Sequence, residues 1–161
     1  MRLLCIDPGP EKSGVVKMHH DRVLFADAEM ENTDVLDKIA QGGFGQLLVE
    51  MIACYGMPVG RETFETCVWI GRFVQHSGDV CPKYIYRRDV KLQLCDSARA
   101  KDANIRQAIL DRYPATGGGK TPQVGTKKQP GPLYGVKSHS WSALALGVYW
   151  FERLKMLKKL R

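Results

Sequence analysis

The chain has 161 residues, with 24 Lys and Arg against 17 Asp and Glu, which gives a net charge of +7. This length suits a single domain with a hydrophobic core of its own. No apolar stretch is long enough to span a bilayer, and the N-terminal segment lacks the features of a signal peptide. The five cysteines are widely spaced without a C-x-x-C pair, which argues against a disulfide framework and against a zinc site. We therefore expect a cytoplasmic protein with reduced thiols and no membrane segment.

The positive charge is concentrated in the second half of the chain. Residues 1–82 contain 7 Lys and Arg against 12 Asp and Glu, a balance of −5, whereas residues 83–161 contain 17 against 5, a balance of +12. A basic half of this kind favours a polyanionic partner such as nucleic acid. A basic surface that is merely solvated would give the same count, so the positions of the charges have to decide between the two.

The hydrophobic patterns predict strands and helices in the order βββαβαβαα. We expect strands at 2–7, 14–18, 22–30, 46–51 and 82–89, and helices at 32–41, 60–78, 100–114 and 137–161. Asn32 or Thr33 is the expected N-cap of the first helix. An antiparallel meander followed by parallel strands and intervening helices gives an α/β fold, with a mixed sheet flanked by helices.

The helix predicted at 60–78 has apolar residues near helical spacing, namely Phe64, Cys67, Val68, Ile70, Gly71 and Val74. We expect Phe64, Cys67, Val68 and Trp69 to lie in the core or in a dimer interface.

Residues 114–136 contain six glycines, four prolines and three lysines, and they show no periodicity. We expect a flexible basic loop here, within a single domain that spans residues 1–161. A loop of this length in a compact domain is usually functional or disordered. Its lysines, Lys120, Lys127 and Lys128, are candidates for contacts with a nucleic-acid backbone, and a solvated linker is the alternative.

Two of the predicted strands end in a carboxylate. The apolar run Leu3–Ile6 stops at Asp7, before a turn rich in Gly and Pro, and a second apolar run leads to Glu50. Such runs are typical of central strands that are buried on both faces. A carboxylate in this position is either a turn former that accepts hydrogen bonds from the following amides or a metal ligand. If the two strands are parallel neighbours, both carboxylates lie at the same edge of the sheet, where α/β proteins form their sites.

The last predicted helix carries polar groups that would meet this edge. A helix that begins near Ser138 places His139 and Ser142, three residues apart, on one helical face. Two carboxylates and an imidazole suit a hard divalent ion such as Mg²⁺ or Mn²⁺. Such an ion neutralises phosphate charge and activates water for an in-line displacement. The acidic cluster would then bind metal, while the basic half holds the polyanion.

Four segments, in this order, resemble the landmark segments of the RuvC-type Holliday-junction resolvases, in particular their phage-borne relatives. They are LLCIDPGPEKSGVV, then LLVEM with the Tyr- and Gly-containing loop after it, RRDVKLQLCDSARAKDANIRQAI and SHSWSALALGVYW, within residues 2 to about 152. The resemblance implies an RNase H-like fold with a mixed five-stranded sheet, a homodimer, and divalent-metal-dependent nicking of branched DNA such as a four-way junction. It therefore implies a crossover junction endodeoxyribonuclease, with Mg²⁺ as cofactor and Mn²⁺ as its substitute.

The resemblance also assigns site residues. Asp7 and Glu50 match metal ligands on the family's first and fourth strands, and His139 matches the first ligand of its C-terminal helix. These three are the expected catalytic residues and metal ligands. Where the family has a further aspartate, this chain has Ser142, whose hydroxyl is a weak neutral ligand. Ser142 or Asp102 is the candidate for the remaining ligand, although the helix dipole alone also favours an acid such as Asp102 at a helix N-terminus.

The expected DNA contacts lie in the basic segment and beside the carboxylates. They are Arg87, Arg88, Lys91, Arg99, Lys101 and Arg106, the loop lysines Lys120, Lys127 and Lys128, and Tyr55, which follows Glu50 and is placed to stack on an unpaired base. The serine at position 142 also favours an alternative function, a non-cleaving or weakly active branched-DNA-binding protein of the same fold.

Overall fold

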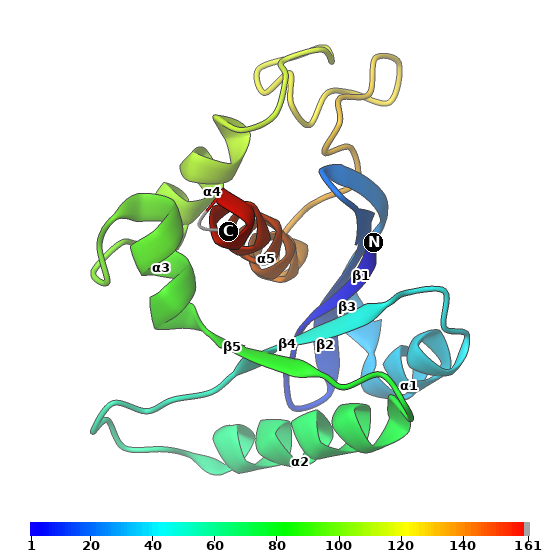
Figure 1. Cartoon of the computed structure of the whole chain (residues 1–161), viewed down its shortest axis with the longest axis vertical. Helices are drawn as coiled ribbons and strands as arrows, with labels where there is room; N and C mark the ends of the chain where they lie inside the picture. Colours follow the sequence, from blue (N-terminus) through cyan, green and yellow to red (C-terminus); the bar gives the residue numbers. More distant parts are fainter. Residues whose placement is uncertain (160–161) are drawn as a thin grey trace.

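The five strands form one mixed sheet in a computed structural model that describes residues 1–159 (Figure 1). The order across the sheet is β3-β2-β1-β4-β5. β1, β2 and β3 form an antiparallel meander, and β4 and β5 continue the sheet parallel to β1. The strands are β1 (Arg2–Asp7), β2 (Lys12–His19), β3 (Arg22–Glu31), β4 (Gln46–Met51) and β5 (Lys83–Tyr86). The predicted α/β class and mixed five-stranded sheet are confirmed.

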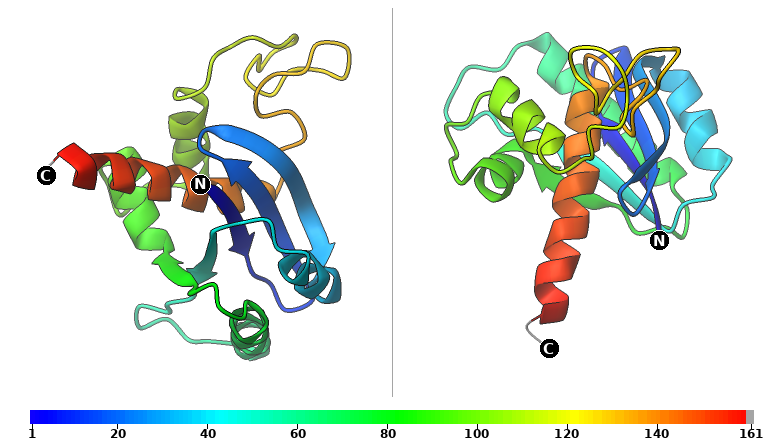
Figure 2. Two further views of the ribbon diagram at one scale, coloured as in Figure 1. Left: turned by 45° about the vertical axis from the view of Figure 1, so that its right-hand side comes forward. Right: turned by 90° about the horizontal axis from the view of Figure 1, so that it is seen from above.

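Helices cover both faces of this sheet (Figure 2). Their bounds are α1 (Asn32–Ala40), α2 (Arg61–His76), α3 (Arg87–Cys95), α4 (Asp102–Leu110) and α5 (Ser140–Lys159). Successive side chains of a strand point to opposite faces, so the apolar run of β1 contributes to two cores. Leu3 and Cys5 join the core beneath α3, α4 and α5, whereas Leu4 and Ile6 join the core beneath α1 and α2. All four side chains are fully buried, as expected for a central strand.

The prediction of a strand over residues 82–89 is wrong in its second half. The strand ends at Tyr86, and helix α3 begins at Arg87 with no loop between them. Val90 and Leu94 are the buried residues of α3, and their spacing of four is helical. Asp96 ends the helix with a left-handed backbone conformation, at a φ of 53°.

Helix α2 buries only part of its predicted apolar residues, and the prediction that the others lie in a dimer interface stays a prediction. The buried residues are Thr66, Ile70 and Phe73, whereas Phe64 and Val68 are 61% and 63% exposed. Apolar residues occur on both sides of this helix, so the sequence pattern alone does not identify the buried face. The outer face of α2 is left with hydrophobic side chains in contact with solvent.

Residues 114–136 contain no helix and no strand, as predicted, but their backbone is extensively hydrogen-bonded to itself. The amides of Gly117, Gly131 and Leu133, for example, donate to the carbonyls of Pro122, Val124 and Gln123. A Cβ at Gly131 would lie 2.3 Å from the carbonyl oxygens of Pro122 and Gln123, so this position requires glycine. The loop has a defined course at one end of the molecule (Figure 1), and its flexibility stays a prediction.

Candidate active site

Three parallel strands deliver charged side chains to one edge of the sheet. In the register of β1 and β4, Ile6 pairs with Val49, so Asp7 and Glu50 follow as neighbours. β5 lies on the other side of β4 and leads directly into Arg87. The side chains of Asp7, Glu50 and Arg87 are 18%, 16% and 22% exposed. The predicted meeting of the two carboxylates at one edge is therefore present, together with a guanidinium.

Buried polar residues fix the turn that follows Asp7. The Ser13 hydroxyl donates to Asn32 Oδ1 at 2.6 Å, and Asn32 Nδ2 donates to the carbonyl of Gly9 at 2.9 Å. Asn32 thus ties the turn to the start of α1 and is not the helix N-cap, which is Glu31. A satisfied buried network of this kind rigidifies its surroundings. It holds the carboxyl end of β1, and hence Asp7, in place.

Close packing against Gly14 brings His139 to the carboxylates. A Cβ at Gly14 would lie 2.5 Å from the carbonyl oxygen of His139, so only glycine allows this approach. His139 precedes α5, which begins at Ser140, and its Nδ1 lies 3.7 Å from Asp7 Oδ2. The imidazole is 65% exposed, so it stands at the mouth of the site with one nitrogen toward Asp7.

Arg87 lies between two carboxylates but satisfies one of them. Its Nη2 donates to Asp102 Oδ1 at 2.6 Å. Its Nη1 lies 3.6 Å from Glu50 Oε2, which is too far for a hydrogen bond. Both of these atoms are buried and have no hydrogen-bond partner in the described part of the chain. The site therefore contains a buried donor and a buried acceptor that face each other unsatisfied.

Burial controls the protonation of both carboxylates. Desolvation, together with the charge of the neighbouring Asp7, raises the pKa of Glu50 to about 7, even though the charge of Arg87 opposes the shift. Desolvation also raises the pKa of Asp7, while Arg87, His139 and the Ser142 hydroxyl oppose it. The two carboxylates thus need more positive charge nearby than the protein itself provides.

These residues fit a divalent metal ion held by two carboxylates. Within residues 1–159, no three His, Cys, Asp or Glu side chains lie close enough together to hold one metal ion. The predicted ligand set of Asp7, Glu50 and His139 is therefore not gathered around one point. Mg²⁺, however, is usually bound by one or two carboxylates, with water and substrate phosphates completing its shell. The buried Glu50 Oε2, which lies beside Asp7 and accepts no hydrogen bond from the described residues, suits such an ion.

The two candidates for the remaining ligand differ in their surroundings. The Ser142 hydroxyl is close enough to Asp7 to lower the pKa of that carboxyl. Asp102 is the first residue of α4, its side chain is 80% exposed, and its carboxylate is engaged by Arg87. A metal-binding role for either residue stays a prediction.

A cleft of about 530 Å³ is lined by Arg87, which lies beside Glu50, and by His139, which lies beside Asp7. Its lining includes Arg87 and Asp102 on one side and His139 and Ser142 on the other. The guanidinium of Arg106 stacks over Trp141 in the same cleft, 4.9 Å from the ring centroid, and Lys137 adds another cation. The cleft thus combines an aromatic surface with basic groups, as a site for a nucleotide does.

The other predicted DNA contacts lie on exposed surface. Tyr55 is 63% exposed, in the loop after β4, and its φ of 46° is left-handed. Beside it, Tyr86 and Arg88 line a shallow surface depression. Lys91 is half-buried, whereas Arg99, Lys101, Lys120, Lys127 and Lys128 are exposed. These side chains are accessible to a ligand, and their contact with DNA stays a prediction.

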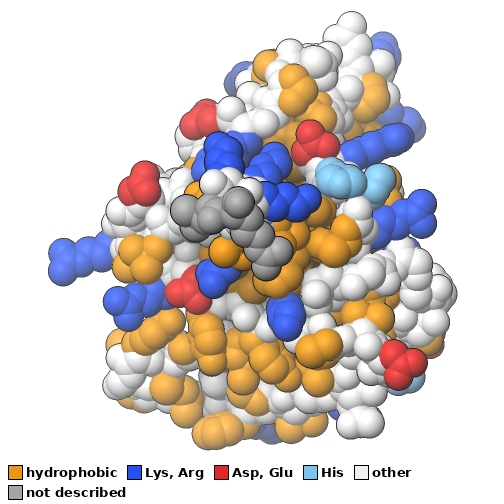
Figure 3. All heavy atoms as spheres, in the orientation of Figure 1, with side chains coloured by type: hydrophobic (Ala, Val, Ile, Leu, Met, Phe, Trp, Pro, Cys, Tyr) orange, Lys and Arg blue, Asp and Glu red, His pale blue; other side chains and the backbone are white. Residues whose placement is uncertain are grey.

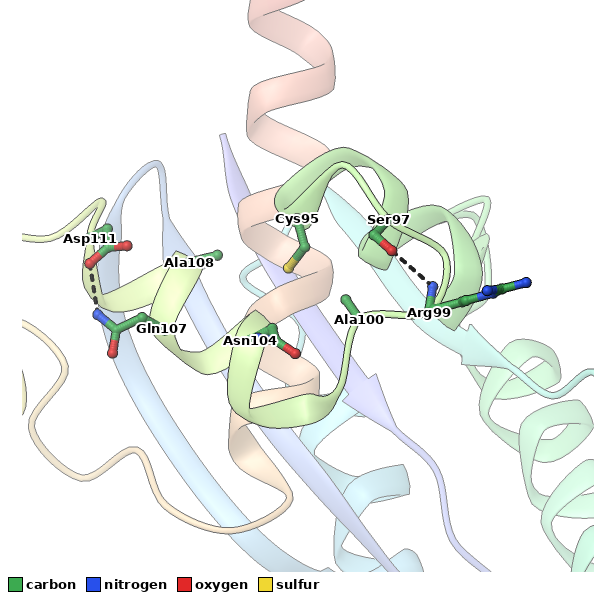
Figure 4. A pocket seen from close by; sticks show the side chains of 8 residues that line it. All are labelled: Cys95, Ser97, Arg99, Ala100, Asn104, Gln107, Ala108 and Asp111. Carbon is green, nitrogen blue, oxygen red and sulfur yellow. Dashed lines mark hydrogen bonds between the residues drawn. The ribbon is translucent and has the colours of Figure 1, made fainter.

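A second cavity, between α3 and α4, does not combine basic groups with an aromatic side chain (Figure 4). It measures about 460 Å³, and Cys95, Asn104 and Asp111 are among its lining residues. The Arg99 backbone amide donates to Ser97 Oγ, and the Arg99 side chain points away from the cavity. Burial raises the pKa of the Cys95 thiol, which disfavours the reactive thiolate.

Arg87 is predicted from the sequence as a DNA contact, but its place beside the carboxylates is not. The available signal is its position directly after a short strand parallel to the strand that contains Glu50. The position of Arg87 at the site follows only if β5 ends at Tyr86 and α3 begins at Arg87. The strand predicted at 82–89 does not contain this boundary.

Glu50→Gln should stabilise the metal-free protein by about 1–2 kcal/mol at pH 8 and by much less at pH 5. A carboxyl whose pKa is raised from 4.5 to about 7 holds its proton more tightly in the folded than in the unfolded state. Its contribution to stability is therefore lost as the pH rises from 4.5 through 7. Thermal unfolding in EDTA at both pH values measures this, with exposed Glu62→Gln as control. An equal change in melting temperature at both pH values would contradict the conclusion that burial of the ionised Glu50 side chain destabilises the folded protein.

No protein-family model matches the chain, and no curated protein matches it. Its structure is similar to a structure of RuvC from Thermus thermophilus, with a TM-score of 0.63, 15% identity, and 95% of each chain covered. It is also similar to Thermus thermophilus RuvC in complex with a Holliday junction substrate, with a TM-score of 0.64, 15% identity, and coverage of 97% of this chain and 96% of that one. The chain therefore has the RNase H-like fold of RuvC over nearly its whole length.

Proposed function

We propose that the protein is a crossover junction endodeoxyribonuclease that hydrolyses phosphodiester bonds in four-way or otherwise branched DNA with the help of Mg²⁺ or Mn²⁺. The observation that carries this proposal is the pair of buried carboxylates, Asp7 and Glu50, at the ends of adjacent parallel strands. They lie beside a basic, aromatic cleft in a fold shared with RuvC, a protein whose structure on a Holliday junction substrate is known.

The divalent ion, when bound, neutralises phosphate charge and makes water more acidic. Asp7 and Glu50 would hold this ion and fix the position of the phosphate. His139 is exposed, and its Nδ1 is directed toward Asp7, so it is placed to accept the proton of the attacking water. Arg106 and Lys137 in the cleft would orient the nucleotide through its phosphates. The reaction would form a bond from water oxygen to phosphorus and break one ester bond.

The basic surface supports binding to the arms of the junction. Arg88 and Lys91 lie on α3, and Arg99 and Lys101 lie between α3 and α4. The loop lysines and Tyr55 are accessible as well, and Tyr55 is placed to stack on an unpaired base. Phosphate neutralisation by such residues supplies affinity without reading sequence.

The outer face of α2 supports the proposal of a homodimer. Hydrophobic side chains gather over the lower part of the molecule, where α2 and the loop before it lie (Figure 3). Phe64 and Val68 are 61% and 63% exposed, and Met57 in the preceding loop is 72% exposed. Contiguous exposed apolar residues of this kind mark interaction surfaces. A symmetric pair of subunits would bring two sites to the two strands of a junction.

No helix among the described residues is long and apolar enough to cross a membrane. All five cysteines are free thiols, which supports a reducing compartment such as the bacterial cytosol.

A non-cleaving junction-binding protein is the second candidate function. Ser142 provides no carboxylate, and Arg87 already places positive charge between Glu50 and Asp102. Both features reduce the net negative charge that would hold a metal ion. A synthetic four-way junction incubated with the protein across Mg²⁺ and Mn²⁺ concentrations separates the two functions, because a binding protein would shift the junction in a gel without nicking it.

Asp7→Asn and Glu50→Gln should each lower the cleavage rate of a four-way junction at least about 100-fold, because each variant loses a ligand for the metal ion. Junction affinity in EDTA should stay the same or rise, since a negative charge near the phosphates is removed. Exposed Asp79→Asn is the matched control and should cut normally. Cleavage by both site variants at the wild-type rate would place the active site elsewhere.

Replacement of Lys120, Lys127 and Lys128 by alanine should make junction affinity less sensitive to salt. Each lost phosphate contact lowers the log–log slope of affinity against salt by about 0.9. A charge-matched triple variant in the acidic half, with Arg2, Arg22 and Lys38 replaced by alanine, should leave the slope near wild type. Equal slopes for wild type and the loop variant would make the loop a linker without DNA contact.

Phe64→Glu combined with Val68→Glu should convert a dimer into monomers, because charges would have to be buried in the apolar contact. Sedimentation velocity across protein concentrations measures the change. Met156→Glu with Leu157→Glu alters two residues that are 53% and 52% exposed near the end of α5, and it serves as control. A wild-type protein that is monomeric throughout would contradict the dimer.

A further inference from the structure

The position of Arg87 is unfavourable unless it serves the site. It is the first residue of α3, and a cation in the first turn of a helix is disfavoured by the helix dipole. Its side chain is also largely withdrawn from water, at 22% exposed. Arg88, the next residue, is exposed and avoids the burial cost. The chain thus keeps one of two adjacent arginines buried at the carboxylate edge.

Asp102 fixes the orientation of this guanidinium. The contact of 2.6 Å to Nη2 comes from the exposed side, where Asp102 begins α4. The hydrogen bond and the charge of Arg87 lower the pKa of Asp102 below its usual range, so the pair stays ionised. With Nη2 engaged, the other terminal nitrogen is directed at Glu50. Asp102 is therefore a positioning residue for Arg87.

The unsatisfied atoms define what would complete the site. Arg87 Nη1 needs an acceptor and Glu50 Oε2 needs a cation or a donor, and the two atoms are 3.6 Å apart and buried. A phosphate oxygen satisfies the guanidinium, and the divalent ion that accompanies the phosphate satisfies the carboxylate. A buried polar group without a hydrogen bond is unfavourable, and more so when the group is charged. A phosphodiester with its metal ion removes both costs together.

We propose that Arg87 binds the phosphate undergoing cleavage and supplies, as a fixed cation, positive charge that a second metal ion would otherwise bring. This inference rests on the proposed nuclease function and adds a residue to it. With Ser142 in place of an acid, the edge offers Asp7 and Glu50 as its buried carboxylates, which suffice for one divalent ion. A guanidinium can donate two hydrogen bonds to a phosphate in a fixed geometry.

The test compares Arg87→Gln with Arg88→Gln, which removes the same charge one residue away at an exposed position. The first measurement is calorimetric titration of Mn²⁺ into the DNA-free protein. Arg87→Gln should bind Mn²⁺ about 10-fold more tightly, because a cation beside Glu50 no longer opposes the ion. Arg88→Gln should leave the Mn²⁺ affinity unchanged. Equal Mn²⁺ affinities for the wild type and Arg87→Gln would overturn the assigned role at the metal site.

The second measurement is single-turnover cleavage of a four-way junction with the protein in excess. Arg87→Gln should cut about 100-fold or more slowly at saturating Mn²⁺, even though it binds the ion more tightly. Asp102→Asn, at a position that is 80% exposed and thus safe for folding, should retain Mn²⁺ binding and cut about 10-fold more slowly. Cleavage by Arg87→Gln at the wild-type rate would overturn the proposal while leaving the nuclease function intact. A wild-type protein that does not cut would contradict the nuclease function, and the Mn²⁺ titration would still decide whether Arg87 opposes the ion.

Discussion

The constraint on which this structure depends is the burial of two carboxylates side by side at the carboxyl edge of parallel strands. Asp7 and Glu50 both lose most of their hydration, and the charge of Asp7 further raises the pKa of Glu50. Nothing in the hydrophobic cores requires acids there, because β1 and β4 are already filled with apolar side chains on both faces. Buried ionisable groups that destabilise the fold are typical of functional sites, because function requires them to be held in place there even though the folded state becomes less stable.

Much of the surrounding fold holds this edge in place. The hydrogen bonds among Gly9, Ser13 and Asn32 fix the turn after Asp7, and the missing side chain of Gly14 lets His139 approach. Arg87, in the first turn of α3, partly compensates the acids, and Asp102, in the first turn of α4, holds its guanidinium. The compensation is incomplete because Arg87 and Glu50 do not close a hydrogen bond. This remaining imbalance is the physical reason to expect a metal ion and a phosphate.

The sequence predicted the acids well and the cation poorly. Asp7 and Glu50 follow unbroken apolar runs, and runs of that kind are specific to buried parallel strands, so their meeting at one edge could be predicted. Arg87 depends on a strand of four residues that passes into a helix without a turn signal, and no local pattern marks that boundary. The buried face of α2 was unpredictable for a related reason. Phe64 and Val68 are as apolar as Ile70 and Phe73, and tertiary packing decides which pair faces the sheet.

The central claim is that the carboxylate edge binds a divalent ion through Asp7 and Glu50. Anomalous diffraction from crystals soaked in Mn²⁺ tests it most directly, because it locates the ion without reference to activity. The account predicts one strong peak within about 2.5 Å of an oxygen of each carboxylate, with the Arg87 guanidinium outside the coordination shell. A peak at Asp102 away from the other two acids, or no peak at this edge at saturating Mn²⁺, would contradict the account.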